Sequence, residues 1–167
     1  MRVLGIDCGT EFTGFGLVEQ VEPGKLRYVA AGAICAKKNS ALPEKLSHIY
    51  KSLCALMETH HPNVVAIEEV FYSVNAKSAL KLGQVRGVAI LAASAAGVEL
   101  AEYAPLAIKS AVVGYGRAEK QQVQQMVMRL LALKELPETE DEADALAIAI
   151  CHLHTSGTLA RQAAGSR

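Results

Sequence analysis

The sequence contains no apolar run long enough to cross a membrane and no continuous apolar segment near its start of the kind that directs secretion. We therefore expect a cytoplasmic protein. It also lacks low-complexity runs, so 167 residues with 51% hydrophobic content predict one globular domain, residues 1–157, followed by a flexible tail, residues 158–167. The four cysteines are scattered and form no CxxC pair, which favours reduced core residues over disulfides or zinc ligands.

Several catalytic signatures are missing as well. The sequence has no GxGxxG dinucleotide fingerprint, no GK[ST] phosphate loop and no serine in a nucleophile elbow. The segment GIDCGT resembles the phosphate loop of sugar-kinase and actin-like ATPases, but those proteins need a second such loop and a longer chain. Two histidine pairs suggest a metal site, but adjacent or i,i+2 side chains on a helix point apart, so we expect surface or packing roles for His60, His61, His152 and His154.

Positive and negative charges balance at 17 each, which argues against indiscriminate binding to polyanions. Their distribution is uneven, however. Residues 73–134 carry eight basic and three acidic side chains, whereas residues 135–144 carry six acidic and no basic ones. A basic middle suits a phosphate backbone, and an acidic cluster repels phosphate unless metal ions neutralise it. The alternative interpretation is a solvated basic face followed by an acidic helix start.

Residues 3–18, VLGIDCGTEFTGFGLV, predict a strand, a tight turn and a second strand. Val3, Leu4 and Ile6 are typical of a buried strand, and three glycines allow the chain to reverse: Gly9, Gly14 and Gly16. Asp7 interrupts the first strand. A carboxylate inside a core-forming strand needs a partner or a cation, so it indicates a site, although an aspartate that caps the turn would also fit.

The rest of the pattern alternates strands and helices. A third strand is expected at 26–34 and further strands at 64–70 and 100–103, with helices at 40–60, 78–96, 105–113, 118–133 and 141–154. Apolar residues at spacings of three and four support the helices. The strand, helix, strand order makes 64–70 a parallel neighbour of the first strand. We therefore expect an α/β fold, a five-stranded mixed sheet with helices on its faces.

More acids are expected to meet Asp7. Glu68 and Glu69 interrupt the strand at 64–70, and alternation puts them on opposite faces, so only one can share a site with Asp7. Asp141 and Asp144 project from one face of the last helix, which is otherwise apolar and must meet the sheet. Two acids also stabilise a helix N-terminus, but the strand acids favour a shared site. Four converging carboxylates suit a pair of Mg²⁺ or Mn²⁺ ions used in phosphoryl transfer.

Nearly the whole chain resembles the RuvC-type Holliday junction resolvases of the ribonuclease H-like fold. The resemblance lies in GIDCGTEFTGFG, AIEEVFYSVNAKSALKLGQVRGVAI, the segments at Lys109 and AEKQQV, and DEADALAIAICH. Two positions depart from the family pattern: Cys8 stands where the family usually has proline, and Glu69 where it commonly has glutamine.

The resemblance implies a set of site residues. The family's four metal-binding acids, which are also its catalytic residues, fall on Asp7, Glu68, Asp141 and Asp144. Its aromatic residue that engages bases at the junction falls on Phe71, and its two phosphate-facing lysines fall on Lys109 and Lys120.

The resemblance also implies an activity and partners. We expect a crossover junction endodeoxyribonuclease with two Mg²⁺ ions per subunit, for which Mn²⁺ can substitute. It would resolve four-way DNA junctions by paired nicks in strands of like polarity, leaving 5′-phosphates, during homologous recombination and repair. The implied partners are a second copy of the chain and a branch-migration helicase complex of the RuvA and RuvB type. A catalytically silent nucleic-acid-binding scaffold is the alternative, and the presence of all four acids argues against it.

The helix at 78–96 is the expected dimer contact. Its apolar residues occur on more than one face, so we predict burial on two sides. One side suits the sheet, and the other, rich in small residues, suits close approach of a symmetry mate. The alternative is a helix enclosed within its own domain.

Overall fold

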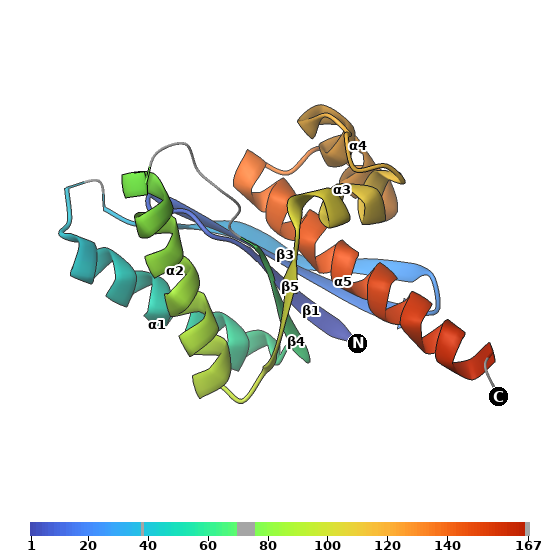
Figure 1. Ribbon diagram of the computed structural model, residues 1–167, viewed down its shortest axis with the longest axis horizontal. Coiled ribbons are helices and arrows are strands. Elements are labelled where there is room, and N and C mark those ends of the chain that lie inside the picture. The colour runs from blue at the N-terminus through green and yellow to red at the C-terminus, as the bar shows by residue number, and fades with distance from the viewer. Residues whose placement is uncertain (38, 70–75, 166–167) are drawn as a thin grey trace.

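The computed structural model describes residues 1–37, 39–69 and 76–165 (Figure 1). The elements, in chain order, are β1 (Arg2–Asp7), β2 (Phe12–Glu22), β3 (Lys25–Cys35), α1 (Leu42–His60), β4 (Val64–Glu68), α2 (Ala76–Ala95), β5 (Glu99–Tyr103), α3 (Pro105–Val113), α4 (Lys120–Leu130) and α5 (Glu140–Gly165). No helix within these ranges is long and apolar enough to cross a membrane.

The strands form one mixed sheet in the order β3-β2-β1-β4-β5. β1 pairs antiparallel with β2 and parallel with β4, and β4 pairs parallel with β5. The predicted parallel neighbours are therefore confirmed. The prediction that Asp7 and Glu68 lie in the middle of their strands was wrong, because each is the last residue of its strand. Both acids consequently stand at the carboxyl ends of neighbouring parallel strands, where open α/β sheets usually bind ligands.

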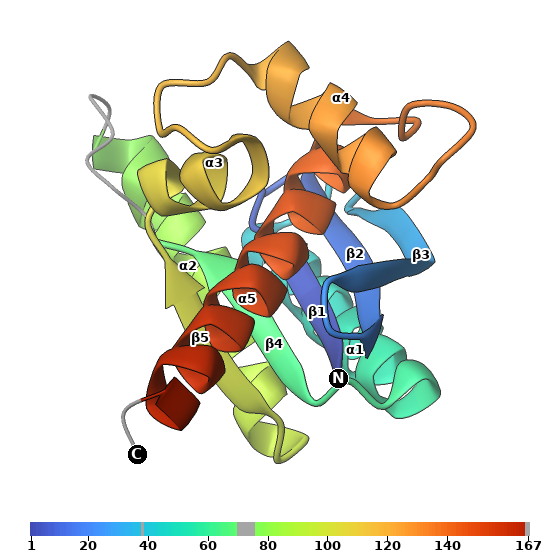
Figure 2. The ribbon, with the colours of Figure 1, turned by 90° about the vertical axis from the view of Figure 1, so that its right-hand side faces the viewer.

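Helices cover both faces of the sheet (Figures 1 and 2). α1 and α2 cover one face, and α5 crosses the other face over β1 and β2, with α3 and α4 packed around its N-terminal half. Strand alternation distributes the core between the two layers: Leu4 and Ile6 face α1 and α2, whereas Val3 faces α5. Because Asp7 follows Ile6, its side chain lies on the α5 face.

Three glycines let α5 lie directly on the sheet. An added Cβ at Gly5 would lie 2.0 Å from the carbonyl oxygen of Ala145, and one at Gly14 would lie 2.2 Å from that of Asp141. Gly16 faces the next turn of α5 in the same way. The sequence had suggested that Gly14 and Gly16 serve the chain reversal, but both lie inside β2. Their role is to admit the helix backbone that carries the acids.

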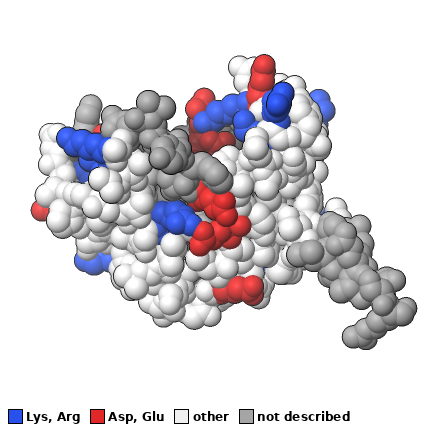
Figure 3. Space-filling view, viewed as in Figure 1, with Lys and Arg blue, Asp and Glu red and all other residues white. Residues whose placement is uncertain are grey.

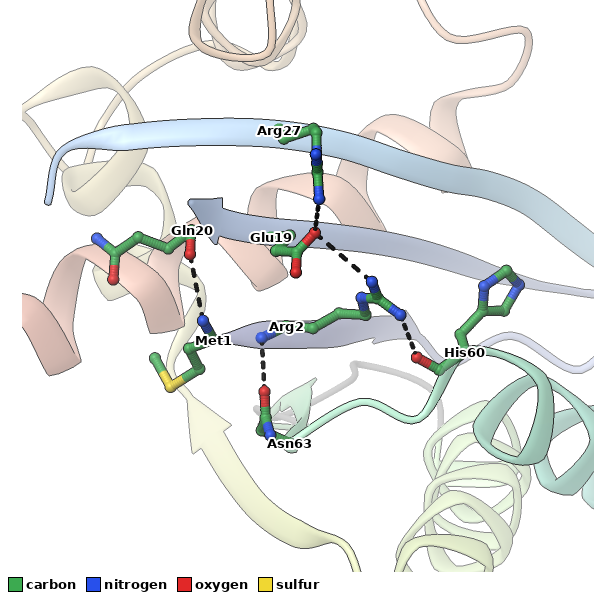
Figure 4. Close-up of polar contacts among 7 residues, drawn as sticks. All are labelled: Met1, Arg2, Glu19, Gln20, Arg27, His60 and Asn63. Carbon is green, nitrogen blue, oxygen red and sulfur yellow. Dashed lines mark hydrogen bonds and ion pairs between the residues drawn. The ribbon is translucent and has the colours of Figure 1, made fainter. Parts of the chain in front are cut away.

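Hydrogen bonds and ion pairs connect the elements at the opposite end of the sheet (Figure 4). The guanidinium of Arg2 donates to the carbonyl oxygen of His60 at 2.6 Å and lies 3.5 Å from the carboxylate of Glu19. Arg27 also donates to Glu19, and this hydrogen bond is the main reason that the pKa of Glu19 falls below its usual value. The backbone N–H of Arg2 donates to the side-chain oxygen of Asn63 at 2.7 Å. These contacts join β1, β2, β3 and the end of α1 far from Asp7.

The last helix extends into the expected tail. α5 runs from Glu140 to Gly165, so it includes residues 158–165. Their sequence, TLARQAAG, is rich in strong helix formers, and a helix that is already nucleated extends through such residues at little cost.

Candidate active site

Asp7, Glu68 and the first turn of α5 meet at the carboxyl ends of β1 and β4. The register pairs Ile6 with Ile67, so Asp7 and Glu68 follow at the next position on the face covered by α5. Gly14, the β2 partner of Asp7, lies against the backbone of Asp141. The structure therefore brings the two strand acids to the start of the helix that carries the two helix acids.

The pKa of Asp7 is raised because its carboxyl group is partly buried and because other acids lie close to it. Burial is the main cause that raises the pKa of this carboxyl from 3.8 to about 7, and the negative charges of Asp144, Glu68 and Asp141 raise it further. Lys120 acts in the opposite direction. Without further positive charge, about half of the Asp7 side chains would carry a proton near pH 7.

Two other acids are perturbed in the same direction. Burial and then the charge of Asp144 raise the pKa of Glu68, against the opposing charges of Lys109 and Lys120. Burial also raises the pKa of Asp144, although its hydrogen bond from Lys120 counteracts this. The nearby positive charge is therefore too small to keep the pKa values of these three carboxyl groups in their usual range.

Lys120 is bound directly to one of these acids, Asp144. Its Nζ donates to Glu140 Oε2 and to Asp144 Oδ2, both at 2.9 Å. Burial favours the neutral amine, but the two hydrogen bonds outweigh it and raise the pKa of Lys120 above its usual value. Lys120 is the first residue of α4, so these contacts hold α4 against the start of α5.

A cavity of about 160 Å³ opens beside the acids. Its polar lining consists of both predicted lysines and two of the acids, Glu68, Lys109, Lys120 and Asp144. Its apolar lining consists of Pro105, Ile108, Val123, Ala147 and Ile148. In the view of Figure 3, acidic surface lies between the α2 side and the α3–α4 side, with a basic patch to its left and another beside the acidic surface at the top. Lys109 and Lys120 thus border the same space as Glu68 and Asp144.

Glu69 and Phe71 follow Glu68 closely in the sequence. Glu69 lies just beyond β4, where its backbone N–H donates to the carbonyl oxygen of Tyr103 at 2.9 Å, and it does not line the cavity that Glu68 lines. Phe71, the expected base-engaging aromatic, lies outside the described residues. Its assignment stays a prediction.

Sequence reasoning missed several contacts around the site. Glu140 shares Lys120 with Asp144, yet nothing distinguishes it in sequence from the other acids at 135–144. The hydroxyl of Tyr103, the β5 partner of Glu68, lies 2.8 Å from Nδ1 of the buried His152 on α5. The periodic pattern marked Tyr103 only as a strand residue, and such long-range pairs carry no local signal.

The acids are suited to a hard divalent cation. All of them offer carboxylate oxygens, the ligands preferred by Mg²⁺ and Mn²⁺, and the raised pKa values of Asp7, Glu68 and Asp144 show a need for positive charge. Across the described ranges, however, no three His, Cys, Asp or Glu side chains are already arranged to enclose an ion. Asp144 is instead bound to Lys120, so metal binding requires these side chains to rearrange.

The chain is similar to known proteins over almost its full length. The family model described as "Crossover junction endodeoxyribonuclease RuvC" matches residues 3–152. A RuvC of Koribacter versatilis is 62% identical over 161 residues, which cover 96% of this chain and 97% of the relative. A RuvC of Acidobacterium capsulatum is 55% identical, with coverage of 97% and 98%.

Solved structures give the same result. Thermus thermophilus RuvC superposes with a TM-score of 0.88 at 33% identity, covering 95% of this chain and 96% of that one. The T. thermophilus protein in complex with a Holliday junction substrate gives 0.90 at the same identity and coverage. The yeast mitochondrial resolvase Ydc2, at 16% identity and a TM-score of 0.71, shares the fold. The expected ribonuclease H-like fold is thereby confirmed, and this chain belongs to the RuvC family of crossover junction endodeoxyribonucleases.

Proposed function

We propose that this RuvC-family enzyme resolves four-way (Holliday) DNA junctions with an active site formed by Asp7, Glu68, Asp141 and Asp144. Its paired nicks fall in strands of like polarity and leave 5′-phosphates and 3′-hydroxyls, during homologous recombination and DNA repair. The observation that supports this proposal is a group of half-buried acids, two of which line one cavity together with two lysines. Both charge types are needed, because the site must bind a cation and still attract a phosphate.

Divalent-metal dependence is general among RuvC-family nucleases. We propose two Mg²⁺ ions per subunit, with Mn²⁺ as a substitute, because the acids form an all-oxygen ligand set. When bound, such ions supply an activated water and stabilise the leaving oxygen of the phosphodiester. Asp7 has to give up its proton to act as a ligand, so its affinity for metal should rise with pH through about 7.

The lysines have a second task in this proposal. In the metal-free protein Lys120 is bound to Glu140 and Asp144 and offsets part of their repulsion. Once a cation neutralises the acids, the ammonium group of Lys120 is available for a phosphate oxygen, and Lys109 approaches from another wall of the cavity. Phe71 would engage a base at the crossover, as the family resemblance implies.

We also propose a two-fold homodimer through α2. Its buried face carries Val85, Ala89 and Ala92, whereas Leu80 and Leu91 on its outer face are 70% and 59% exposed. Between these leucines, at helical spacing, lie Gly83 and Gly87, where an added Cβ would meet nothing within 4 Å. Two leucines flanking small residues suit a close helix contact with a symmetry mate. The dimer would place one active site on each of the two strands to be cut.

Two wider assignments belong to the same proposal. A branch-migration helicase complex of the RuvA and RuvB type would deliver the junction, and the enzyme would act in the cytoplasm. The family membership supports both, and neither rests on a particular contact in this chain.

The deciding experiment is cleavage of a synthetic four-way junction and of a linear duplex with the same sequence, with and without Mg²⁺. We expect the wild type to nick only the junction, and only with Mg²⁺. Asp7→Asn should bind the junction without cutting it, because the amide weakens metal binding and leaves the basic surface unchanged. Near wild-type cleavage by Asp7→Asn would show that the metal site is misplaced.

Glu68→Gln and Glu69→Gln form a matched pair for this assay. Both remove one carboxylate at adjacent positions, but only Glu68 lines the cavity. We expect Glu68→Gln to be inactive and Glu69→Gln to cut at nearly the wild-type rate. The reverse pattern would transfer the metal-ligand role to Glu69.

A further inference from the structure

The loop between α3 and α4, two helices that line the cavity, carries an exposed tyrosine and an exposed arginine. α3 ends at Val113, the following Gly114 turns the chain away with a φ of 96°, and α4 begins at Lys120. Between them, Tyr115 is 47% exposed and Arg117 is exposed. The loop thus joins the helix that carries Lys109 to the first residue of the helix that carries Lys120.

The ring of Tyr115 is held in place although about half of it is exposed. Its hydroxyl donates to Gln122 Oε1 at 2.8 Å, and the same oxygen accepts the backbone N–H of Glu119 at 2.9 Å. Glu119 and Gln122 form the capping box of α4, so the helix start has its own cap without the tyrosine. The hydrogen bond to Gln122 fixes the position of the Tyr115 side chain. It does not explain why an aromatic residue is exposed to solvent here.

The loop is anchored on both sides of Arg117. An added Cβ at Gly116 would lie 3.2 Å from the carbonyl oxygen of Leu106 and 3.4 Å from Ser110 Oγ, so the loop rests on α3. Ala118 is only 2% exposed. The structure records no ion pair for Arg117 within the described ranges. Only two residues separate it from Lys120, so their Cα atoms lie at most about 11 Å apart.

We propose that this loop is a further DNA-contact element of the proposed junction endonuclease, on whose function the inference rests. Arg117 binds a phosphate of the strand that runs past Lys120, and Tyr115 stacks on a base that is unpaired where the strands exchange. Guanidinium groups contact phosphates whatever the base pairing, whereas an aromatic ring can stack only on a base that has left its own stack. The two residues therefore have different tasks: Arg117 adds affinity for any DNA, and Tyr115 adds preference for the junction over duplex.

The test measures dissociation constants for a synthetic four-way junction and for linear duplex, in EDTA and over a range of salt concentrations. Tyr115→Ala should weaken junction binding roughly 5- to 150-fold, the value of one base stacked on an aromatic ring, and change duplex binding by less than about twofold. Tyr115→Phe, which keeps the ring, should stay close to wild type. Arg117→Ala should weaken both substrates and lower the log-log salt slope by about one, and Arg117→Lys should restore most of this.

Matched controls come from elsewhere in the chain. Tyr28→Ala removes a tyrosine that is 39% exposed on β3, and Arg129→Ala removes one exposed positive charge at the far end of α4. Both should leave the binding constants and the salt slope unchanged, and thermal unfolding checks that every variant is folded.

Two results would overturn the inference while the wild type still binds and cuts the junction. One is junction binding by Tyr115→Ala and Arg117→Ala within twofold of wild type. The other is an equal loss for Tyr115→Phe and Tyr115→Ala, which would assign the effect to the hydrogen bond with Gln122. A wild type that neither prefers nor cuts the junction would instead refute the proposed function itself.

Discussion

Replacing Asp7 by asparagine is expected to stabilise the metal-free protein at alkaline pH while it abolishes cleavage. Burial and the neighbouring charges raise the pKa of Asp7 from 3.8 to about 7. Because the folded pKa exceeds the unfolded one, the folded state binds more protons between these values, and the free energy of unfolding falls as pH rises from about 4 to 7. A shift of about three pKa units corresponds to about 4 kcal/mol, an upper figure because coupled acids share the shift.

The assay is urea unfolding of wild type and Asp7→Asn in EDTA at about pH 4.5 and about pH 8. Between the two pH values, the stability of the variant relative to the wild type should rise by up to about 3 kcal/mol, and added Mg²⁺ should reduce this difference in stability because it stabilises the wild type. Glu19→Gln is the control, because the pKa of Glu19 is lowered and its contribution disappears only when pH falls below its usual range. A stability difference between Asp7→Asn and wild type that does not grow with pH would refute this reasoning.

Three other predictions follow from single contacts. Gly14→Ala should lower both stability and cleavage, because its methyl group meets the backbone of Asp141; circular dichroism melts and the junction assay check this. Leu91→Glu should yield a folded monomer in sedimentation, since Leu91 is 59% exposed in the single chain, and a variant that stays dimeric would move the interface away from α2. Tyr103→Phe should cost about 1 to 3 kcal/mol in urea unfolding, because it leaves the buried His152 without its hydroxyl partner.

The parts of the fold that depend on local pattern could be predicted from the sequence. The β-branched runs ending in Asp7 and Glu68 identified two strands, and apolar spacings of three and four identified the helices. The strand, helix, strand order then gave the parallel pairing of β1 with β4. Because these two acids were expected on neighbouring parallel strands, their proximity could also be predicted from the sequence.

What the sequence did not predict depends on contacts between distant segments. The role of Gly14 became clear only when α5 was seen against β2, since glycine in a reversal and glycine under a helix look the same in sequence. The ion pairs of Lys120 require α4 to lie against α5, which no periodicity specifies. The exact strand ends at Asp7 and Glu68 were also misjudged, because the apolar pattern continues into residues that no longer pair.

The same packing that brings the acids together also lowers the stability of the fold, because the acids repel one another. Gly5, Gly14 and Gly16 allow the α5 backbone to touch β1 and β2, and this close contact forces Asp141 and Asp144 toward Asp7. A side chain at any of these glycines would separate the acids and relieve their repulsion, but it would also disperse the oxygen ligands that a divalent cation needs. Lys120 offsets only part of the repulsion, as the pKa of Asp7 near 7 indicates. In the metal-free fold, the negative charge of these acids is therefore only partly neutralised. The gain in stability on binding a divalent cation should be greatest where Asp7 is ionised, above about pH 7.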